Sequence, residues 1–232
     1  MESVDILGVK ISKVDYQSAM RAVERFLADG RKHYIVTPNP EFIVRAQKDC
    51  QFCQILNRAD LAIPDGIGLR VGTKVTGTDL MIGLCELAAK KGFSVFLLGG
   101  RGGVAKEAAK RLKTQFANLN IVGTYEGDSP GGITAADFLF VAYGAPKQEK
   151  WIARNLPKIP VKVAMGVGGA FDFIAGKRKR APRILRRLGL EWLWRLIQEP
   201  QRLPRIFNAT IRFPLLVWRQ RLYKNTGVAR QR

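Results

Sequence analysis

Histidine and cysteine are scarce in this sequence, which contains one histidine, His33, and three cysteines at positions 50, 53 and 85. A single histidine argues against a Ser-His-Asp or Cys-His catalytic group. Cys50 and Cys53 have the spacing of a redox or zinc pair, but there is no second pair, so we expect neither a metal site nor a disulfide framework. No two aspartates are spaced Asp-x-Asp, a common sign of a metal-diphosphate site, and we expect no cofactor.

Long apolar runs are also missing. The longest apolar stretches, such as 160–176, are interrupted by charge and glycine before they reach the roughly 18 to 20 residues that a membrane-crossing helix needs. The sequence opens on MESVDILGVKIS without a cleavable hydrophobic leader, which together with the few cysteines predicts a reducing, cytosolic compartment. A hydrophobic content of 47% over 232 residues supplies enough material for a substantial core.

Acidic residues are almost absent from the C-terminal part of the chain. Residues 177–232 hold 16 basic and 2 acidic side chains, whereas residues 1–176 hold 23 and 17. This imbalance predicts a polyanionic partner, which could be nucleic acid, anionic lipid headgroups or a phosphorylated substrate. We therefore divide the chain into a Rossmann-like catalytic domain, 1–176, and a basic appendage, 177–232.

Short β-branched and apolar runs alternate with helical patterns through the first domain. The expected strands are 33–37, 59–63, 94–98, 120–124, 138–143 and 161–167. The expected helices are 18–28, 41–57, 78–91, 104–116 and 147–155. This alternation predicts an α/β fold with a mostly parallel sheet flanked by helices. One connection, 124–137, is short for a parallel crossover, so either its two strands are not parallel neighbours or a segment found in relatives is missing.

The loops that follow the expected strands are rich in glycine and polar residues. In a parallel sheet these loops all emerge at one edge, where ligands bind. Glycines allow backbone N–H groups to approach a ligand, and helix N-termini favour anions, so this edge suits a phosphate-bearing molecule. The loops are 37–40, 64–68, 99–103, 144–149 and 166–172.

Two features of this edge leave alternatives open. Gly100-x-Gly102-x-x-Ala105, with Glu126 about twenty residues later, imitates a dinucleotide fingerprint, but it equally fits a nucleotide-phosphate loop or a tight turn. Asp65 could act as a general base on a hydroxyl acceptor or could cap the next helix. Asp172 lies in an apolar Gly-Phe-Asp-Phe setting, which favours a structural role.

The appendage mixes basic residues with leucine, isoleucine and tryptophan in an amphipathic pattern, which predicts a basic, amphipathic, helical C-terminal appendage. Three interpretations compete: docking on an anionic membrane surface, binding nucleic acid, and packing against another subunit. The aliphatic content favours lipid over nucleic acid, because apolar burial and about 1 kcal/mol per basic residue near an anionic leaflet reinforce each other.

An ordered series of motifs from about Asp5 to Arg205 resembles the WecG/TagA/CpsF glycosyltransferase family, glycosyltransferase family 26, and most resembles its TagA branch. The motifs are Thr37-Pro-Asn39, Pro64-Asp65-Gly66-Ile-Gly68, Thr76-Gly-Thr-Asp-Leu80, Leu98-Gly-Gly100, Gly144-Ala-Pro-Lys-Gln-Glu-Lys-Trp151, Gly166-Val-Gly-Gly-Ala-Phe-Asp172, Arg180-Ala-Pro-Arg183 and Gly189-Leu-Glu-Trp192.

For that branch the resemblance implies transfer of N-acetylmannosamine from UDP-N-acetylmannosamine to the 4-hydroxyl of N-acetylglucosaminyl-diphospho-undecaprenol. The product is the β-linked disaccharide of wall teichoic acid, made with inversion and without a metal ion. Related enzymes use other donors, such as UDP-N-acetylmannosaminuronic acid. The alternatives from other classes are an NAD-binding oxidoreductase, which depends on the Gly100 loop, and a nucleic-acid-binding protein, which depends only on charge.

The resemblance also implies roles for individual residues. Asp65 is the expected general base, with Thr37, Asn39 and Gln148 around the donor sugar. Loop amides near Gly99, Gly100, Gly144 and Gly168, helped by arginines of the appendage, are expected to stabilise the diphosphate. The appendage is expected to close the active site, to adjust homo-oligomer assembly and to hold the enzyme at the inner face of the cell membrane, through Arg183, Arg186, Arg187, Trp192, Arg195, Arg205 and Arg212.

Overall fold

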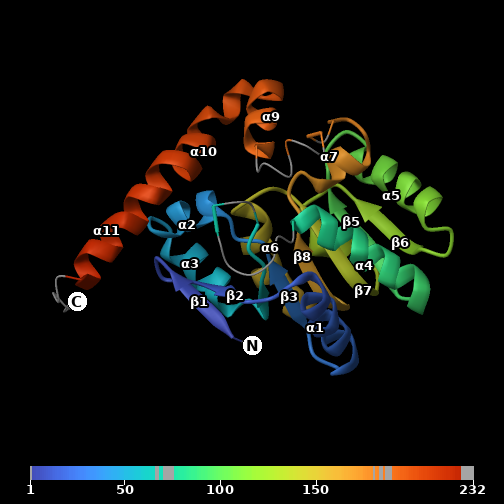
Figure 1. The fold of residues 1–232 in the computed structure, drawn as a ribbon. Helices are drawn as coiled ribbons and strands as arrows, with labels where there is room; N and C mark the ends of the chain where they lie inside the picture. Colours follow the sequence, from blue (N-terminus) through green and yellow to red (C-terminus); the bar gives the residue numbers. More distant parts are fainter. Residues whose placement is uncertain are drawn as a thin grey trace.

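The computed structural model describes residues 2–65, 68–69, 76–179, 181–182, 185 and 190–225, without the side chains of 191, 195 and 221–225. Its centre is a sheet of six parallel strands with the spatial order β4-β3-β8-β7-β5-β6 (Figure 1). Each expected strand overlaps one of these, so the α/β, Rossmann-like fold is confirmed. The strands are β3 (His33–Val36), β4 (Leu61–Ala62), β5 (Ser94–Gly99), β6 (Asn120–Tyr125), β7 (Ala136–Ala142) and β8 (Val161–Gly166).

Helices cover both faces of the sheet. Successive apolar side chains of a strand point to opposite faces, so each face has its own hydrophobic core. On β5, Leu97 packs into one core cluster, whereas Phe96 and Leu98 pack into another on the opposite face. The first face carries α1 (Tyr16–Ala28), α4 (Gly77–Lys91), α5 (Val104–Gln115) and α7 (Ala170–Ile174). The second carries α2 (Pro40–Ala46), α3 (Cys50–Arg58), α6 (Lys147–Asn155) and the short η2 (Leu156–Lys158).

The single helix expected over 41–57 is wrong, because the chain forms α2 and α3 in its place. Asp49 interrupts the pattern by acting as the N-cap of α3, where its side chain accepts a hydrogen bond from the backbone N–H of Phe52 at 3.0 Å. A side chain that satisfies a free helical N–H group favours a new helix start over continuation of the previous helix. Apolar periodicity continues across the break, which explains why the sequence pattern did not reveal it.

An N-terminal hairpin, β1 (Ser3–Ile6) and β2 (Val9–Ser12), was not expected from the sequence. Its turn places Leu7 and Gly8 at φ 54° and 81°. The hairpin joins the domain through β2, because Lys10 N–H donates to the side chain of Asn57 at 2.8 Å. Val9 and Ile11 are fully buried in the core beneath α2 and α3.

The short connection between β6 and β7 is a crossover between two strands that both run parallel to β5. The two strands are not neighbours, because β5 lies between them and pairs with both. The first of the two alternatives left open by the sequence therefore holds, but the strand order does not by itself account for the shortness of this parallel crossover. The connection contains only the short η1 (Pro130–Gly132), and Ile133 anchors it in the core beside α6.

The appendage forms an arm of helices that runs along the outside of α2 (Figure 1). Its elements are α9 (Glu191–Gln198), η3 (Pro200–Arg202), α10 (Leu203–Phe207), the π-helical η4 (Asn208–Arg212) and α11 (Phe213–Asn225). Phe213 is buried in the same core cluster as Phe42 of α2. Among the described residues, no helix is both long enough and apolar enough to span a bilayer.

Candidate active site

The first two loops at the carboxyl edge of the sheet are joined by backbone hydrogen bonds. The N–H of Asp65, in the loop after β4, donates to the carbonyl of Pro38, in the loop after β3, at 2.9 Å. This bond brings the expected general base beside the loop that carries Thr37 and Asn39. Asp65 is partly buried, and residues 66–67, which follow it, lie outside the described part of the chain.

Thr37 and Asn39 both lie where a strand gives way to a helix. Thr37 is buried and packs against the start of α4, because a Cβ on Gly77 would lie 3.1 Å from Thr37 Cγ2. Asn39 caps α2, and its Oδ1 accepts the backbone N–H of Phe42 at 2.9 Å. The cap uses the oxygen of the carboxamide, so the Nδ2 donor is the end that can serve a ligand.

The glycine loop after β5 makes contacts that differ from those of a dinucleotide-binding loop. The backbone N–H groups of Gly102 and Gly103, at the start of α5, donate to the carboxylate of Glu126 at 3.1 and 2.8 Å. In a dinucleotide fingerprint such N–H groups bind the pyrophosphate, and the acidic residue binds a ribose hydroxyl. Here the acidic residue occupies the position of the anion, which removes the structural basis for the NAD interpretation.

Gly99 and Gly100 bring this loop close to its neighbours in the sheet. Gly99 has φ 97°, and a Cβ at this position would lie 3.0 Å from the backbone of Ala142. A Cβ on Gly100 would lie 3.2 Å from the ring of Phe171, in α7. Only glycine allows this approach without displacing the neighbouring strand or helix.

Gln148 ties together the loops that follow β7 and β8. Its Oε1 accepts the N–H of Gly144 at 3.1 Å and the N–H of Gly168 at 3.0 Å. Its Nε2 donates to Oε1 of Glu149 at 2.7 Å. Gln148 is only 2% exposed, so the structure places it beneath this edge, with its oxygen committed to the two glycine loops.

Glu149 lies next to Gln148 and is completely buried, a feature that the sequence analysis did not recognise. Burial raises the pKa of its carboxyl to about 7, although hydrogen bonds from Gln148 and from its own backbone N–H, and the charge of Arg45, act in the opposite direction. Oε2 has no hydrogen-bond partner. The pair packs directly on Gly166, because a Cβ there would lie 2.7 Å from Gln148 Nε2 and 3.0 Å from Glu149 Oε1.

The loop that begins the short β6–β7 connection is held by residues of α6 and of the loop before it. Lys147 pairs with Asp128 at 2.6 Å, and the indole N–H of Trp151 donates to the Asp128 carbonyl at 2.8 Å. The Tyr143 hydroxyl donates to the carbonyl of Gly127. The start of the short connection, at Gly127 and Asp128, is therefore fixed at the same edge as the glycine loops.

The sole histidine lies at the other end of the sheet, at the start of β3. His33 is buried, with Nε2 2.9 Å from Asp29 and Nδ1 2.9 Å from Asp60. The hydrogen bond with His33 holds the pKa of the Asp29 carboxyl well below its ordinary value. His33 is thus part of a buried structural cluster with Asp29 and Asp60, at the opposite end of the sheet from the glycine loops.

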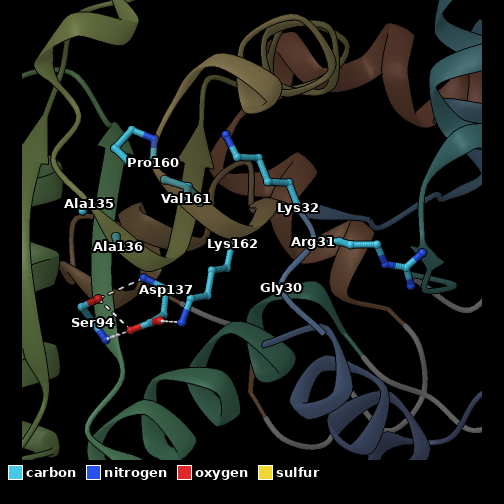
Figure 2. Close-up of a pocket in the computed structure, with 10 residues that line it drawn as sticks. All are labelled: Gly30, Arg31, Lys32, Ser94, Ala135, Ala136, Asp137, Pro160, Val161 and Lys162. Atoms are coloured by element: carbon cyan, nitrogen blue, oxygen red, sulfur yellow. Dashed lines mark hydrogen bonds and ion pairs between the residues drawn. The ribbon is translucent and has the colours of Figure 1, made fainter. Parts of the chain in front are cut away.

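A hollow of about 330 Å³ also lies at this opposite edge, beside the first residues of β5, β7 and β8 (Figure 2). Its charged side chains already have partners within the protein. Lys162 pairs with Asp137 at 2.8 Å, and Asp137 also accepts the N–H and hydroxyl of Ser94, both at 2.8 Å. Lys32 donates to two backbone carbonyls. Because ligands of open parallel sheets bind at the carboxyl ends of the strands, we assign the candidate site to the edge with the glycine loops.

Polar contacts attach the appendage to the domain near this edge. Arg178 of the appendage faces Asp172 of the domain at 3.9 Å. Within the appendage, Arg178 also pairs with Glu199, which pairs in turn with Arg202, and the indole N–H of Trp194 donates to the carbonyl of Lys179 at 3.0 Å. Arg205 lies 3.5 Å from Glu41 of α2, the helix that Asn39 caps. Among the residues expected to meet lipid or phosphate, Arg183, Arg186 and Arg187 and the side chain of Arg195 lie outside the described part of the chain.

The outer surface of the appendage carries a row of exposed apolar side chains. Along α10, η4 and α11 they recur every three or four residues, which places them on one side of the arm. The row consists of Leu203, Phe207, Ile211, Leu215 and Trp218, with exposed fractions of 60%, 55%, 49%, 58% and 62%. Trp192 in α9 is also exposed. We call the row from Leu203 to Trp218 the apolar stripe.

Comparison with known proteins agrees with this geometry. Residues 4–227 match the model of the glycosyl transferase WecG/TagA/CpsF family. Two curated relatives carry the name N-acetylglucosaminyldiphosphoundecaprenol N-acetyl-beta-D-mannosaminyltransferase. The relative from Bacillus subtilis is 32% identical over 220 residues, covering 84% of this chain and 86% of the relative. The relative from Staphylococcus aureus strain MRSA252 is 29% identical over 227 residues, covering 90% and 89%. The chain described here is a glycosyltransferase of the WecG/TagA/CpsF family.

Proposed function

We propose that this enzyme transfers N-acetylmannosamine from UDP-N-acetylmannosamine to the 4-hydroxyl of N-acetylglucosaminyl-diphospho-undecaprenol, with inversion and without a metal ion. The shared name of the curated relatives, which match most of this chain, is the observation that carries the substrate assignment. The family resemblance stated for the sequence supports the same reaction. Its product would be the lipid-linked disaccharide of wall teichoic acid.

The proposed mechanism is a single displacement with Asp65 as the general base. The acceptor oxygen attacks the anomeric carbon while the bond from that carbon to the UDP oxygen breaks, and the hydroxyl proton passes to the Asp65 carboxylate. The hydrogen bond between Asp65 and Pro38 supports this role, because it keeps Asp65 beside the loop of Thr37 and Asn39, proposed to hold the donor sugar.

The leaving diphosphate gains negative charge as the bond breaks. Backbone N–H groups fixed near that oxygen would stabilise the charge without reorganising. In our proposal these groups come from Gly99, Gly100 and the neighbours of Gly144 and Gly168 in their loops, with arginines of the appendage completing the site. The N–H groups of Gly144 and Gly168 themselves already bind Gln148 Oε1. The amides of Gly102 and Gly103 are committed to Glu126 and are not included.

We also propose that the appendage docks on the anionic inner face of the cell membrane. The apolar stripe and the 16 basic residues of 177–232 support this, because apolar burial and attraction to anionic lipid act together. An acceptor with a polyprenyl chain stays in the bilayer, so an enzyme held at the surface meets its sugar there.

Replacement of the base tests the mechanism. Asp65→Asn should lower the rate of UDP release by at least about a hundredfold, because general-base catalysis typically contributes that much or more. The affinity for UDP should not change, since the amide keeps the size of the side chain. The measurement is UDP release with a short-chain analogue of the lipid acceptor, together with UDP binding by calorimetry.

Asp5→Asn is the control, because Asp5 caps the turn of the N-terminal hairpin through the N–H of Gly8. This variant should keep wild-type turnover. Full turnover by Asp65→Asn would remove Asp65 from the role of base. Turnover by the wild-type enzyme with UDP-N-acetylmannosaminuronic acid and none with UDP-N-acetylmannosamine would contradict the proposed donor while leaving the family assignment intact.

A further inference from the structure

Glu149 is the one acidic residue among the buried polar side chains that the structure describes, and its position is costly. Oε2 is buried without a hydrogen-bond partner, and the raised pKa of the carboxyl reflects that burial. A buried polar atom without a partner costs roughly 1 to 3 kcal/mol of stability. An apolar side chain of similar size would avoid this cost, so packing alone does not account for an acid here.

The effect of Glu149 reaches the glycine loops through Gln148. A carboxamide presents an acceptor oxygen at one end and a donor nitrogen at the other. Glu149 accepts from the nitrogen at 2.7 Å, which leaves the oxygen for the N–H groups of Gly144 and Gly168. If the carboxamide turned over, its nitrogen would face two N–H donors, so an acceptor at Glu149 selects the arrangement that bridges the loops.

The bridged loops follow β7 and β8, which are adjacent strands in the middle of the sheet. Gly166, the last residue of β8, makes room for the Gln148–Glu149 pair. Backbone pairing joins β7 and β8 up to Val141 and Val167, and beyond the strand ends the Gln148 carboxamide bridges the two loops.

We propose that Glu149 is a positioning residue for glycosyl transfer: by accepting a hydrogen bond from Gln148, it fixes the carboxamide that holds the loops after β7 and β8 together at the candidate active site. This inference depends on the glycosyltransferase activity of the family, and on the proposed donor only as the substrate of the assay.

The test separates activity from folding by comparing Glu149→Met with Glu149→Gln. Methionine fills the space but offers no comparable acceptor, so kcat/KM should fall by at least about tenfold, since a misplacement of 1 Å can cost about a hundredfold. The melting temperature should change little, because the substitution removes the unpartnered Oε2 but leaves Gln148 Nε2 without its acceptor. Glutamine keeps an acceptor at this position, so Glu149→Gln should retain kcat/KM to within about threefold of the wild type.

A double-mutant cycle tests whether Glu149 acts through Gln148. If it does, Gln148→Met combined with Glu149→Met should be no less active than Gln148→Met alone. Glu107→Gln is the matched control, because Glu107 lies in the first turn of α5, pairs with Arg111 near the surface and should leave kcat/KM unchanged.

Folded Glu149→Met protein with wild-type kcat/KM would overturn the proposal, and so would additive losses of activity in the double-mutant cycle.

If Glu149→Met does not fold, Glu149→Asp serves instead, because its shorter side chain keeps the acid but withdraws it from Gln148. A loss of at least about tenfold supports the proposal, and an unchanged kcat/KM overturns it. All variants are assayed with whichever UDP-sugar the wild type turns over, so an error in the proposed donor appears in the wild type and not as a difference between variants.

Discussion

The carboxyl of Glu149 should make the folded state less stable as the pH rises. Its pKa is raised from 4.5 to about 7, so the folded protein holds a proton that the unfolded chain has released between these values. Stability is therefore lost as the pH rises through this window, by about 3 kcal/mol for this group. The free energy of unfolding of Glu149→Gln minus that of the wild type should increase by up to this amount between pH 5 and pH 8.

Chemical denaturation at several pH values measures this difference. Glu107→Gln is again the control. The hydrogen bond from Arg111 lowers the pKa of Glu107, so any change with pH in the difference between its free energy of unfolding and that of the wild type should have the opposite sign. If the difference in free energy of unfolding between Glu149→Gln and the wild type does not change with pH, the carboxyl of Glu149 has the same pKa in the folded and unfolded protein, which would contradict this prediction.

For single residues, the position of the candidate residues in the fold could be predicted from the sequence better than their contacts could. Because loops after parallel strands share one edge, Thr37, Asn39, Asp65 and Gln148 could be assigned to that edge from the motifs. The hydrogen bonds of Gln148 could not be predicted, because they depend on which backbone N–H groups two separate loops bring to it. For the same reason Glu149 passed unnoticed within a motif that was otherwise recognised.

Among the elements, the appendage has one side that packs against the domain and another that is exposed to solvent. Phe213 packs into the core with Phe42, so it attaches the arm to α2, whereas the apolar stripe faces outward. The amphipathic sequence predicted helices but did not separate these sides, because apolar residues occur on both. Cutting the chain after Gly176 would remove the attachment together with the stripe, so substitutions within the stripe test membrane docking more cleanly.

Replacing Phe207 and Trp218 together by serine should weaken binding to vesicles that contain anionic phospholipid. Burial of a large apolar side chain contributes on the order of 2 kcal/mol, so the loss of two should lower the affinity by at least about tenfold. The melting temperature should hardly change, because both side chains are more than half exposed. Vesicle co-sedimentation measures the binding.

Val122→Ser is the control, because Val122 is an exposed apolar residue on β6, at the edge of the sheet away from the arm. Its binding to the same vesicles should match the wild type. Equal binding by the double variant and the wild type would exclude the stripe as the membrane contact.

For the whole molecule, the choice between nucleotide ligands can be measured directly. A ligand that binds only the folded state raises the melting temperature by mass action. UDP should therefore raise it, whereas NAD should have no effect, because Glu126 already occupies the N–H groups of Gly102 and Gly103. A thermal shift with each ligand is the measurement, and stabilisation by NAD alone would contradict the proposed donor class.

The strand order also determines when the protein can fold during synthesis. β8 is the last strand of the sheet in the sequence, yet it lies between β3 and β7 and pairs with both. Until residues 161–166 have left the ribosome, the nascent chain can pair β3 only with β4, and β7 only with β5, so each piece keeps an unpaired edge. Insertion of a central strand between distant segments is slow. The emerging chain therefore exposes strand edges and apolar surface for most of its translation, which makes it a natural substrate for chaperones that bind nascent chains.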